Sequence, residues 1–256
     1  MKRRPFALIN WKMSMTIDES LDFLDDFMTR TGPLLDRLDL VLCPAYTALA
    51  SVDRALEGTP IALGAQNVAA TTNPARTGQI SATLLAEAGC RWVMLGHWEV
   101  RRNLGDDDLT INRKAHLALS EGITPILLVG EAQGDRRPRA ESLTKTLRRT
   151  LKGLHADQVT QMAIVYEPEG AIGVSRPVTP EHVAAGSGTI RDWIGQQWGD
   201  GVAEQVRIVY GGSVAPEHAT ELLESTDIDG LGATRRGRDP AAFAQIVRQI
   251  IAAKGE

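Results

Sequence analysis

The chain has 256 residues, of which 43% are hydrophobic and 23% charged, with 24 glycines and two cysteines. This composition excludes a fibrous or disordered chain, and the length fits one or two domains, because α/β barrels commonly reach about 250 residues as one unit. The 28 basic and 32 acidic residues leave a formal charge of -4, which favours neither nucleic acid nor an anionic membrane as a partner. Any bound anion must therefore be held by a local site.

Cysteine use and the N-terminal sequence indicate the cellular compartment. Cys43 and Cys90 are too few for a disulfide scaffold, and we expect both to be buried as small hydrophobic residues. The basic Lys2-Arg3-Arg4 precedes only four apolar residues before Asn10, whereas the apolar core of a signal peptide needs about 7 to 15. We find no stretch long enough to span a membrane. These features predict a cytoplasmic protein.

Short apolar segments bounded by turn residues predict eight β-strands. In chain order they are Phe6–Trp11, Leu38–Cys43, Pro60–Ala65, Trp92–Leu95, Ile123–Val129, Met162–Tyr166, Val206–Tyr210 and Ile228–Leu231. The apolar residues are continuous rather than alternating, which is typical of parallel strands covered on both faces.

Amphipathic segments between the strands predict helices, for example at Leu21–Phe27, Ser81–Ala88 and Ala241–Ala253. Thr179-Pro180 and Asp239-Pro240 predict helix starts, because a capping oxygen precedes a proline at the first helical position. Eight strand-helix units without a long linker favour the α/β class, as a single closed (β/α)8 barrel over residues 1–256. An open doubly wound sheet would show much the same alternation.

Polar side chains gather where the expected strands end. They are Asn10 and Lys12 after the first strand, Gly96-His97-Trp98-Glu99 after the fourth, Glu167 to Gly173 after the sixth, Gly211-Gly212-Ser213 after the seventh and Gly232 to Arg236 after the eighth. In a barrel these loops share one rim, where active sites form. A lysine, a histidine and a glutamate there would supply a cation, a proton shuttle and a base, and glycine-rich turns would offer N–H groups to an anion. Each residue alone could equally be an ordinary solvated or turn residue.

Several of these segments resemble the signature sequences of the triosephosphate isomerase family, in the family's order and over the whole chain. They are Asn10-Trp11-Lys12-Met13, Gly96-His97, Tyr166-Glu167-Pro168, Ala171-Ile172-Gly173 and Tyr210-Gly211-Gly212-Ser213-Val214. The resemblance implies a TIM barrel and an isomerase without cofactor or metal. Such an enzyme interconverts dihydroxyacetone phosphate and glyceraldehyde 3-phosphate through an enediol, a step of glycolysis and gluconeogenesis.

The resemblance also implies a role for each site residue. Glu167 would be the base, His97 would polarise the carbonyl and shuttle protons, and Lys12 would stabilise negative charge, with Asn10 positioning it. The residues implied to bind the phosphate of a small sugar are Gly173, Gly212, Ser213, Thr234 and Arg235. The segment Pro168 to Arg176 would form a lid that excludes water, and the family implies a homodimer.

The chain departs from the family pattern beside the expected site. Trp98 and Val100 replace a serine and an arginine, Glu169-Gly170 replaces a valine and a tryptophan, and Thr234-Arg235 replaces two glycines. We expect the Trp98 indole to fill space that the lid tryptophan would take. Gln79 stands where the family has the glutamate that pairs with the missing arginine at the dimer interface, so no single charge is left unpaired.

Arg235 leaves the substrate open. Its side chain could be solvated, or its guanidinium could hold the phosphate or a further oxygen of a longer substrate. An isomerase of a four-carbon ketose phosphate, such as erythrulose phosphate, is therefore the main alternative. A non-catalytic sugar-phosphate-binding paralogue is a more distant one, because Asn10, Lys12, His97 and Glu167 are all retained.

Overall fold

Eight parallel strands close into a barrel in the computed structural model, which describes residues 3–255. The strands are β1 (Phe6–Asn10), β2 (Asp39–Cys43), β3 (Ile61–Ala65), β4 (Trp92–Leu95), β5 (Thr124–Val129), β6 (Ala163–Tyr166), β7 (Arg207–Gly211) and β8 (Gly230–Ala233). They pair in chain order, and β8 closes on β1. The predicted (β/α)8 barrel is therefore confirmed, and the open sheet is excluded.

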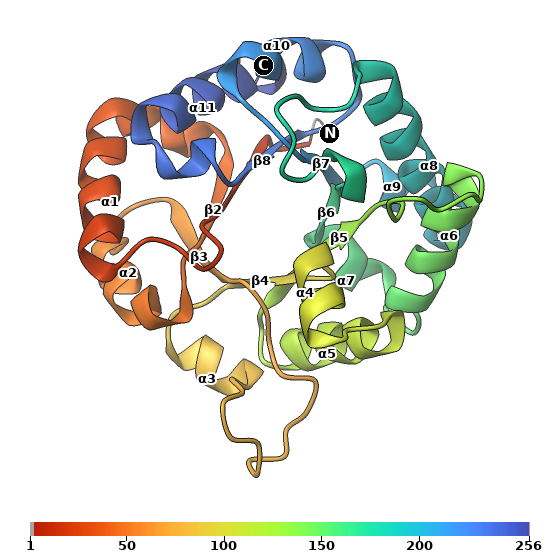
Figure 1. The fold of residues 1–256 in the computed structure, drawn as a ribbon, viewed down its shortest axis with the longest axis horizontal. Helices are drawn as coiled ribbons and strands as arrows, with labels where there is room; N and C mark the ends of the chain where they lie inside the picture. Colours follow the sequence, from red (N-terminus) through yellow and green to blue (C-terminus); the bar gives the residue numbers. More distant parts are fainter. Residues whose placement is uncertain (1–2, 256) are drawn as a thin grey trace.

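Helices surround the barrel as an outer ring (Figure 1). They are α1 (Ile17–Thr31), α2 (Leu49–Ala55), α3 (Ala82–Glu87), α4 (Trp98–Leu104), α5 (Asp108–Ser120), α6 (Arg139–Thr150), α7 (Ala156–Gln161), α8 (Pro180–Trp198), α9 (Asp200–Ala203), α10 (Pro216–Glu224) and α11 (Pro240–Lys254). The side chains of Thr179 and Asp239 cap α8 and α11, as predicted. Both caps accept hydrogen bonds from the first free backbone N–H groups.

The predicted strands agree with the observed ones to within two residues at each end. The largest shift is at β8, which begins at Gly230 rather than Ile228. A Cβ atom at Gly230 would lie 1.7 Å from the carbonyl oxygen of Phe6, so only glycine lets β8 approach β1 this closely. Glycine carries no apolar signal, which is why hydrophobicity alone shifts the strand toward its N-terminus.

The barrel interior and the layer between strands and helices form two hydrophobic clusters. Phe6, Leu8, Met94 and Val209 belong to the interior cluster. Cys43 and Cys90 are free and buried, as predicted. Burial raises the pKa of the Cys90 thiol to about 12, so it stays protonated at neutral pH.

Ion pairs close the barrel end at which the strands begin. Asp229 pairs with Arg3 at 2.5 Å and with Arg191 at 3.3 Å, and it also accepts the Ile208 N–H at 2.7 Å. Asp39 pairs in the same way with two further arginines of this end. The buried carboxylate of Asp229 is therefore fully satisfied.

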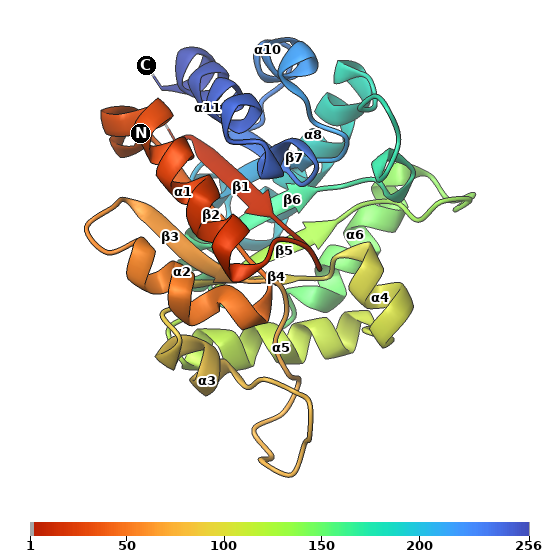
Figure 2. The same cartoon turned by 60° about the vertical axis from the view of Figure 1, so that its left-hand side comes forward.

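The segment between β3 and α3 extends away from the rest of the molecule (Figures 1 and 2). It covers residues 66–81 and contains no helix or strand. None of the helices within residues 3–255 has both the length and the apolar character needed to cross a membrane.

Candidate active site

The rim at the carboxyl ends of β1, β4 and β6 holds the four expected catalytic side chains. His97 Nε2 lies 3.7 Å from Glu167 Oε2. Lys12 Nζ lies 2.5 Å from Glu99 Oε1, and Glu99 follows His97 by two residues. The structure thus brings Lys12, His97 and Glu167 to one place from three distant parts of the chain.

Glu167 follows the last residue of β6 and is 9% exposed. Its backbone N–H donates to the carbonyl of Val129 at 2.8 Å, which continues the pairing with β5. Its buried Oε2 has no hydrogen-bond partner among the described residues. Burial raises the pKa of Glu167, opposed by the charges of His97 and Lys12. A buried, unpaired carboxylate of this kind is suited to accept a proton from a bound substrate.

His97 caps α4 with its side chain. Its Nδ1 accepts the N–H of Glu99 at 3.1 Å. An imidazole nitrogen that accepts a hydrogen bond carries no proton, so in the neutral ring the proton sits on Nε2. That N–H is the one that faces Glu167 and the rim, where it can donate to a developing oxyanion.

Lys12 has a strained backbone, with φ at 52°. Two contacts hold it: Asn10 Oδ1 accepts the Lys12 N–H at 2.9 Å, and Gln66 Nε2 donates to the Lys12 carbonyl at 2.7 Å. A left-handed conformation in a side chain as long as lysine is unusual and persists only when surrounding groups impose it. Asn10 thus acts on the backbone of Lys12, and Gln66 is a second support.

The five expected phosphate-binding residues line one cavity of about 260 Å³ together with Lys12 and Glu167. They are Gly173, Gly212, Ser213, Thr234 and Arg235. The Ser213 hydroxyl lies 2.6 Å from the carbonyl of Val174 in the lid segment. Arg235 is exposed, and its guanidinium has no ion pair or hydrogen bond within residues 3–255. It is therefore available to an anion in this cavity.

The predicted lid, residues 168–176, begins with a short 3-10 helix at Glu169–Ala171. The Glu169 carboxylate is buried and accepts the Gln133 N–H at 2.6 Å. Beyond the other end of the lid, the Val178 N–H donates to the Tyr210 hydroxyl at 3.3 Å. The exposed middle of the lid lies between these two anchored ends.

The space directly beside Gly170 is open, because a Cβ atom there would find no atom within 4 Å. The indole of Trp98 lies at the start of the lid, where Nε1 donates to the carbonyl oxygen of Glu167 at 3.1 Å. The indole N–H is a hydrogen-bond donor, and the nearby carbonyl oxygen of Glu167 accepts this hydrogen bond. That the indole fills the space of a lid tryptophan stays a prediction.

Val100 and Gln79, the positions of the lost charge pair, line a second cavity of about 800 Å³ near the extended segment after β3.

Two residues that our sequence analysis did not assign to the active site lie in it. Glu99 contacts Lys12 and orients His97, and its place beside His97 in the sequence was the available signal. Gln66 stands in the segment Gly64-Ala65-Gln66-Asn67, which also resembles the family, but its contact with Lys12 had no local signal because it comes from a different loop.

The part of the chain that the structure describes brings no three His, Cys, Asp or Glu side chains together as a metal-binding group.

Comparison with known proteins gives one consistent result. The family model described as triosephosphate isomerase matches residues 5–250. The triosephosphate isomerase of Symbiobacterium thermophilum is 39% identical over 246 residues, which covers 95% of this chain and 96% of that protein. That of Herpetosiphon aurantiacus is 40% identical over 248 residues, with 96% and 99% covered. That of Chloroflexus aurantiacus is 37% identical over 247 residues, with 96% and 98% covered.

Proposed function

The chain belongs to the triosephosphate isomerase family, and from this premise we propose how its own residues carry the reaction. The enzyme is an isomerase that interconverts dihydroxyacetone phosphate and glyceraldehyde 3-phosphate. The proposal concerns the roles of the individual side chains, the substrate contacts and the assembly.

Glu167 removes a proton from the carbon next to the substrate carbonyl. The electron pair of that C–H bond forms the carbon-carbon double bond of the enediolate, and the carbonyl electrons move onto oxygen. The Nε2–H of His97 donates to that oxygen, and Lys12 supplies a fixed positive charge beside it. His97 gives its Nε2 proton to that oxygen and takes up the proton of the hydroxyl on the neighbouring carbon, whose oxygen becomes the new carbonyl. Return of the proton from Glu167 to the former carbonyl carbon completes the isomerisation without net oxidation.

One observation carries this assignment: the buried Oε2 of Glu167 has no hydrogen-bond partner within residues 3–255 and lies 3.7 Å from His97 Nε2. Leaving a buried carboxylate oxygen unsatisfied costs stability. Such a cost is typical of functional sites, where the missing partner is the substrate.

The phosphate of the substrate binds in the cavity lined by Gly173, Ser213 and Arg235. Backbone N–H groups at Gly173 and Ser213 are available for an anion there, and Arg235 adds a free positive charge. The lid reaches this cavity through Ser213, whose hydroxyl lies 2.6 Å from the Val174 carbonyl. Bound phosphate therefore links lid closure to substrate binding, which protects the enediolate from water.

A second copy of the chain is the proposed partner. Met13, next to Lys12, is 97% exposed and Leu104 is 69% exposed, although both are large and apolar. Leu104 also lines the 800 Å³ cavity beside the extended segment after β3. Large exposed apolar side chains, one of them at the edge of a cavity, are typical of an interface. Analytical ultracentrifugation should give a dimer mass.

A cytoplasmic location stays a prediction and rests on the unpaired, buried cysteines.

The test is a substrate panel on the wild-type protein and Glu167→Gln. Wild-type protein should turn over dihydroxyacetone phosphate and glyceraldehyde 3-phosphate, and Glu167→Gln should lose about 10²- to 10⁴-fold in kcat because the amide cannot accept a proton. Erythrulose phosphates belong in the same panel, since preferential turnover of these would shift the substrate to four carbons. An active Glu167→Gln protein would refute Glu167 as the base.

A further inference from the structure

The first residue of α4 contacts the backbone of the proposed base. Trp98 Nε1 donates to the carbonyl oxygen of Glu167 at 3.1 Å. This carbonyl belongs to the peptide bond between Glu167 and Pro168, so it lies at the junction between the base and the lid. Any movement of this peptide also moves the Cα atom from which the Glu167 carboxylate extends.

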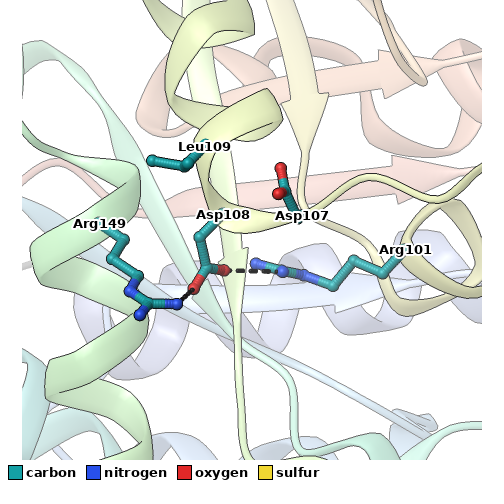
Figure 3. Close-up of a pocket in the computed structure, with 5 residues that line it drawn as sticks. All are labelled: Arg101, Asp107, Asp108, Leu109 and Arg149. Atoms are coloured by element: carbon teal, nitrogen blue, oxygen red, sulfur yellow. Dashed lines mark hydrogen bonds and ion pairs between the residues drawn. The ribbon is translucent and has the colours of Figure 1, made fainter.

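The indole of Trp98 is itself held in place. The guanidinium of Arg101 lies 5.6 Å from the ring centroid, within the range of a cation-π contact. Arg101 is fixed in turn, because its Nε donates to the Gly96 carbonyl at 2.9 Å and its Nη1 donates to Asp108 Oδ1 at 2.8 Å (Figure 3). The donor that reaches Glu167 therefore comes from a rigid group rather than from a mobile surface side chain.

Gly130 also packs against this peptide. A Cβ atom at Gly130 would lie 2.0 Å from the Glu167 carbonyl oxygen and 2.5 Å from its carbon. The backbone of Glu167 thus packs directly onto that of Gly130. The carbonyl that accepts the indole N–H is therefore also in close contact with the loop after β5.

A second residue of α4 holds the next part of the lid. Arg102 follows Trp98 by four residues, so both side chains extend from one face of the helix. Arg102 Nη2 lies 2.5 Å from Glu169 Oε1, and Glu169 is buried. The Glu169 carboxylate also accepts the Gln133 N–H at 2.6 Å. Two successive contacts from α4 therefore meet the lid where it begins.

We propose that Trp98 and Arg102 form a clamp, here called the α4 clamp, which fixes the start of the lid and thereby positions Glu167 toward His97. Trp98 is a positioning residue, because it acts through the Glu167 backbone and not on the substrate. The inference rests on Glu167 as the base. Small displacements of a reacting group matter, since a misplacement of about 1 Å can cost about 10²-fold in rate.

Two variants separate the hydrogen bond of Trp98 from its bulk. Trp98→Phe keeps an aromatic ring but removes the donor. Trp98→His keeps a donor, because its Nε2 occupies the same place in a five-membered ring as the indole Nε1, but it removes the outer ring. The α4 clamp predicts that kcat falls about tenfold in Trp98→Phe and less than about threefold in Trp98→His, with KM nearly unchanged in both.

The ranking of the two variants decides the matter. If Trp98 acts only by filling space, Trp98→Phe will be more active than Trp98→His. A kcat of Trp98→Phe that equals or exceeds that of Trp98→His would overturn the inference. The pH profile is an independent readout. A Glu167 carboxylate released from its buried position has a lower pKa, so the acidic limb of kcat/KM should move to lower pH in Trp98→Phe and not in Trp98→His.

Arg102 provides a second test that does not depend on folding of the Trp98 variants, because its side chain is largely exposed. In Arg102→Gln, the amides of Glu169 and Ala171, which bond to Glu131 and Pro168, should exchange their hydrogens several-fold faster. Unchanged exchange would remove Arg102 from the α4 clamp. Loss of activity in Glu167→Gln with wild-type rates in Trp98→Phe would refute the α4 clamp alone and leave the proposed function standing.

Discussion

The two ends of this barrel differ in how completely their buried charged groups are hydrogen-bonded. At the end where the strands begin, Asp229 has two arginine partners and a backbone N–H. At the end where the strands finish, a buried carboxylate oxygen of Glu167 accepts no hydrogen bond from the described part of the chain, and Lys12 has a strained backbone. The same scaffold thus concentrates stability at one end and unsatisfied groups at the other, where a substrate can complete them.

The largest expected effect is on kcat, at the end of the barrel where the strands finish. His97→Gln should reduce kcat by about 10²- to 10⁴-fold, because the substrate oxyanion loses its proton donor. Unfolding temperature should stay near the wild-type value, which calorimetry can measure. His116→Gln is the matched control, since His116 lies on α5 in the outer ring, where its Nε2 is 3.0 Å from the carbonyl oxygen of Lys152 in the turn after α6. Equal losses in both variants would contradict the role of His97.

At the end where the strands begin, a substitution should reduce stability and leave activity unchanged. Asp229→Ala removes the buried partner of Arg3 and Arg191 and leaves the Ile208 N–H without its acceptor, which should lower the free energy of unfolding by about 3 to 5 kcal/mol. At about 2 to 4 °C per kcal/mol, Tm should fall by roughly 10 °C, while kcat of the folded protein stays unchanged.

Asp227→Ala is the control for this substitution. Asp227 pairs with the same two arginines, but its side chain is 68% exposed. Its loss should cost no more than about 1 kcal/mol. If Asp227→Ala destabilises as much as Asp229→Ala, burial does not explain the difference.

A pH titration tests the unpaired carboxylate directly. Burial raises the pKa of Glu167 above its usual value of 4.5. The base must be ionised to accept a proton, so kcat/KM should fall as the pH drops through a midpoint above 4.5. Circular dichroism over the same range separates this titration from unfolding. A midpoint at or below 4.5 would show that Glu167 is not held in a desolvated site.

Arg235 should give the smallest effect, because its guanidinium is exposed to solvent. Arg235→Gly should raise KM for both triose phosphates about three- to tenfold, less than a buried charge-assisted contact would. The inhibition constant of inorganic phosphate should rise by the same factor, and Arg235→Lys should recover part of it. Unchanged values in Arg235→Gly would mean that the side chain is merely solvated.

The amino-acid sequence by itself determined the strand order, the strand positions to within two residues and the loops that carry the site. These features are local: continuous apolar runs predict buried parallel strands, and Thr179 and Asp239 predict helix starts. His97 and Glu167 could be found as candidates because each lies within two residues of the end of such a strand.

Contacts between distant loops depended on the tertiary structure. Gln66 supports Lys12 from 54 residues away, and Trp98 reaches the Glu167 carbonyl across 69 residues. Nothing local to position 98 indicates whether its indole fills space or donates a hydrogen bond. Closure and register of the barrel decide which backbone group each side chain meets, and no pattern within a single segment contains that information.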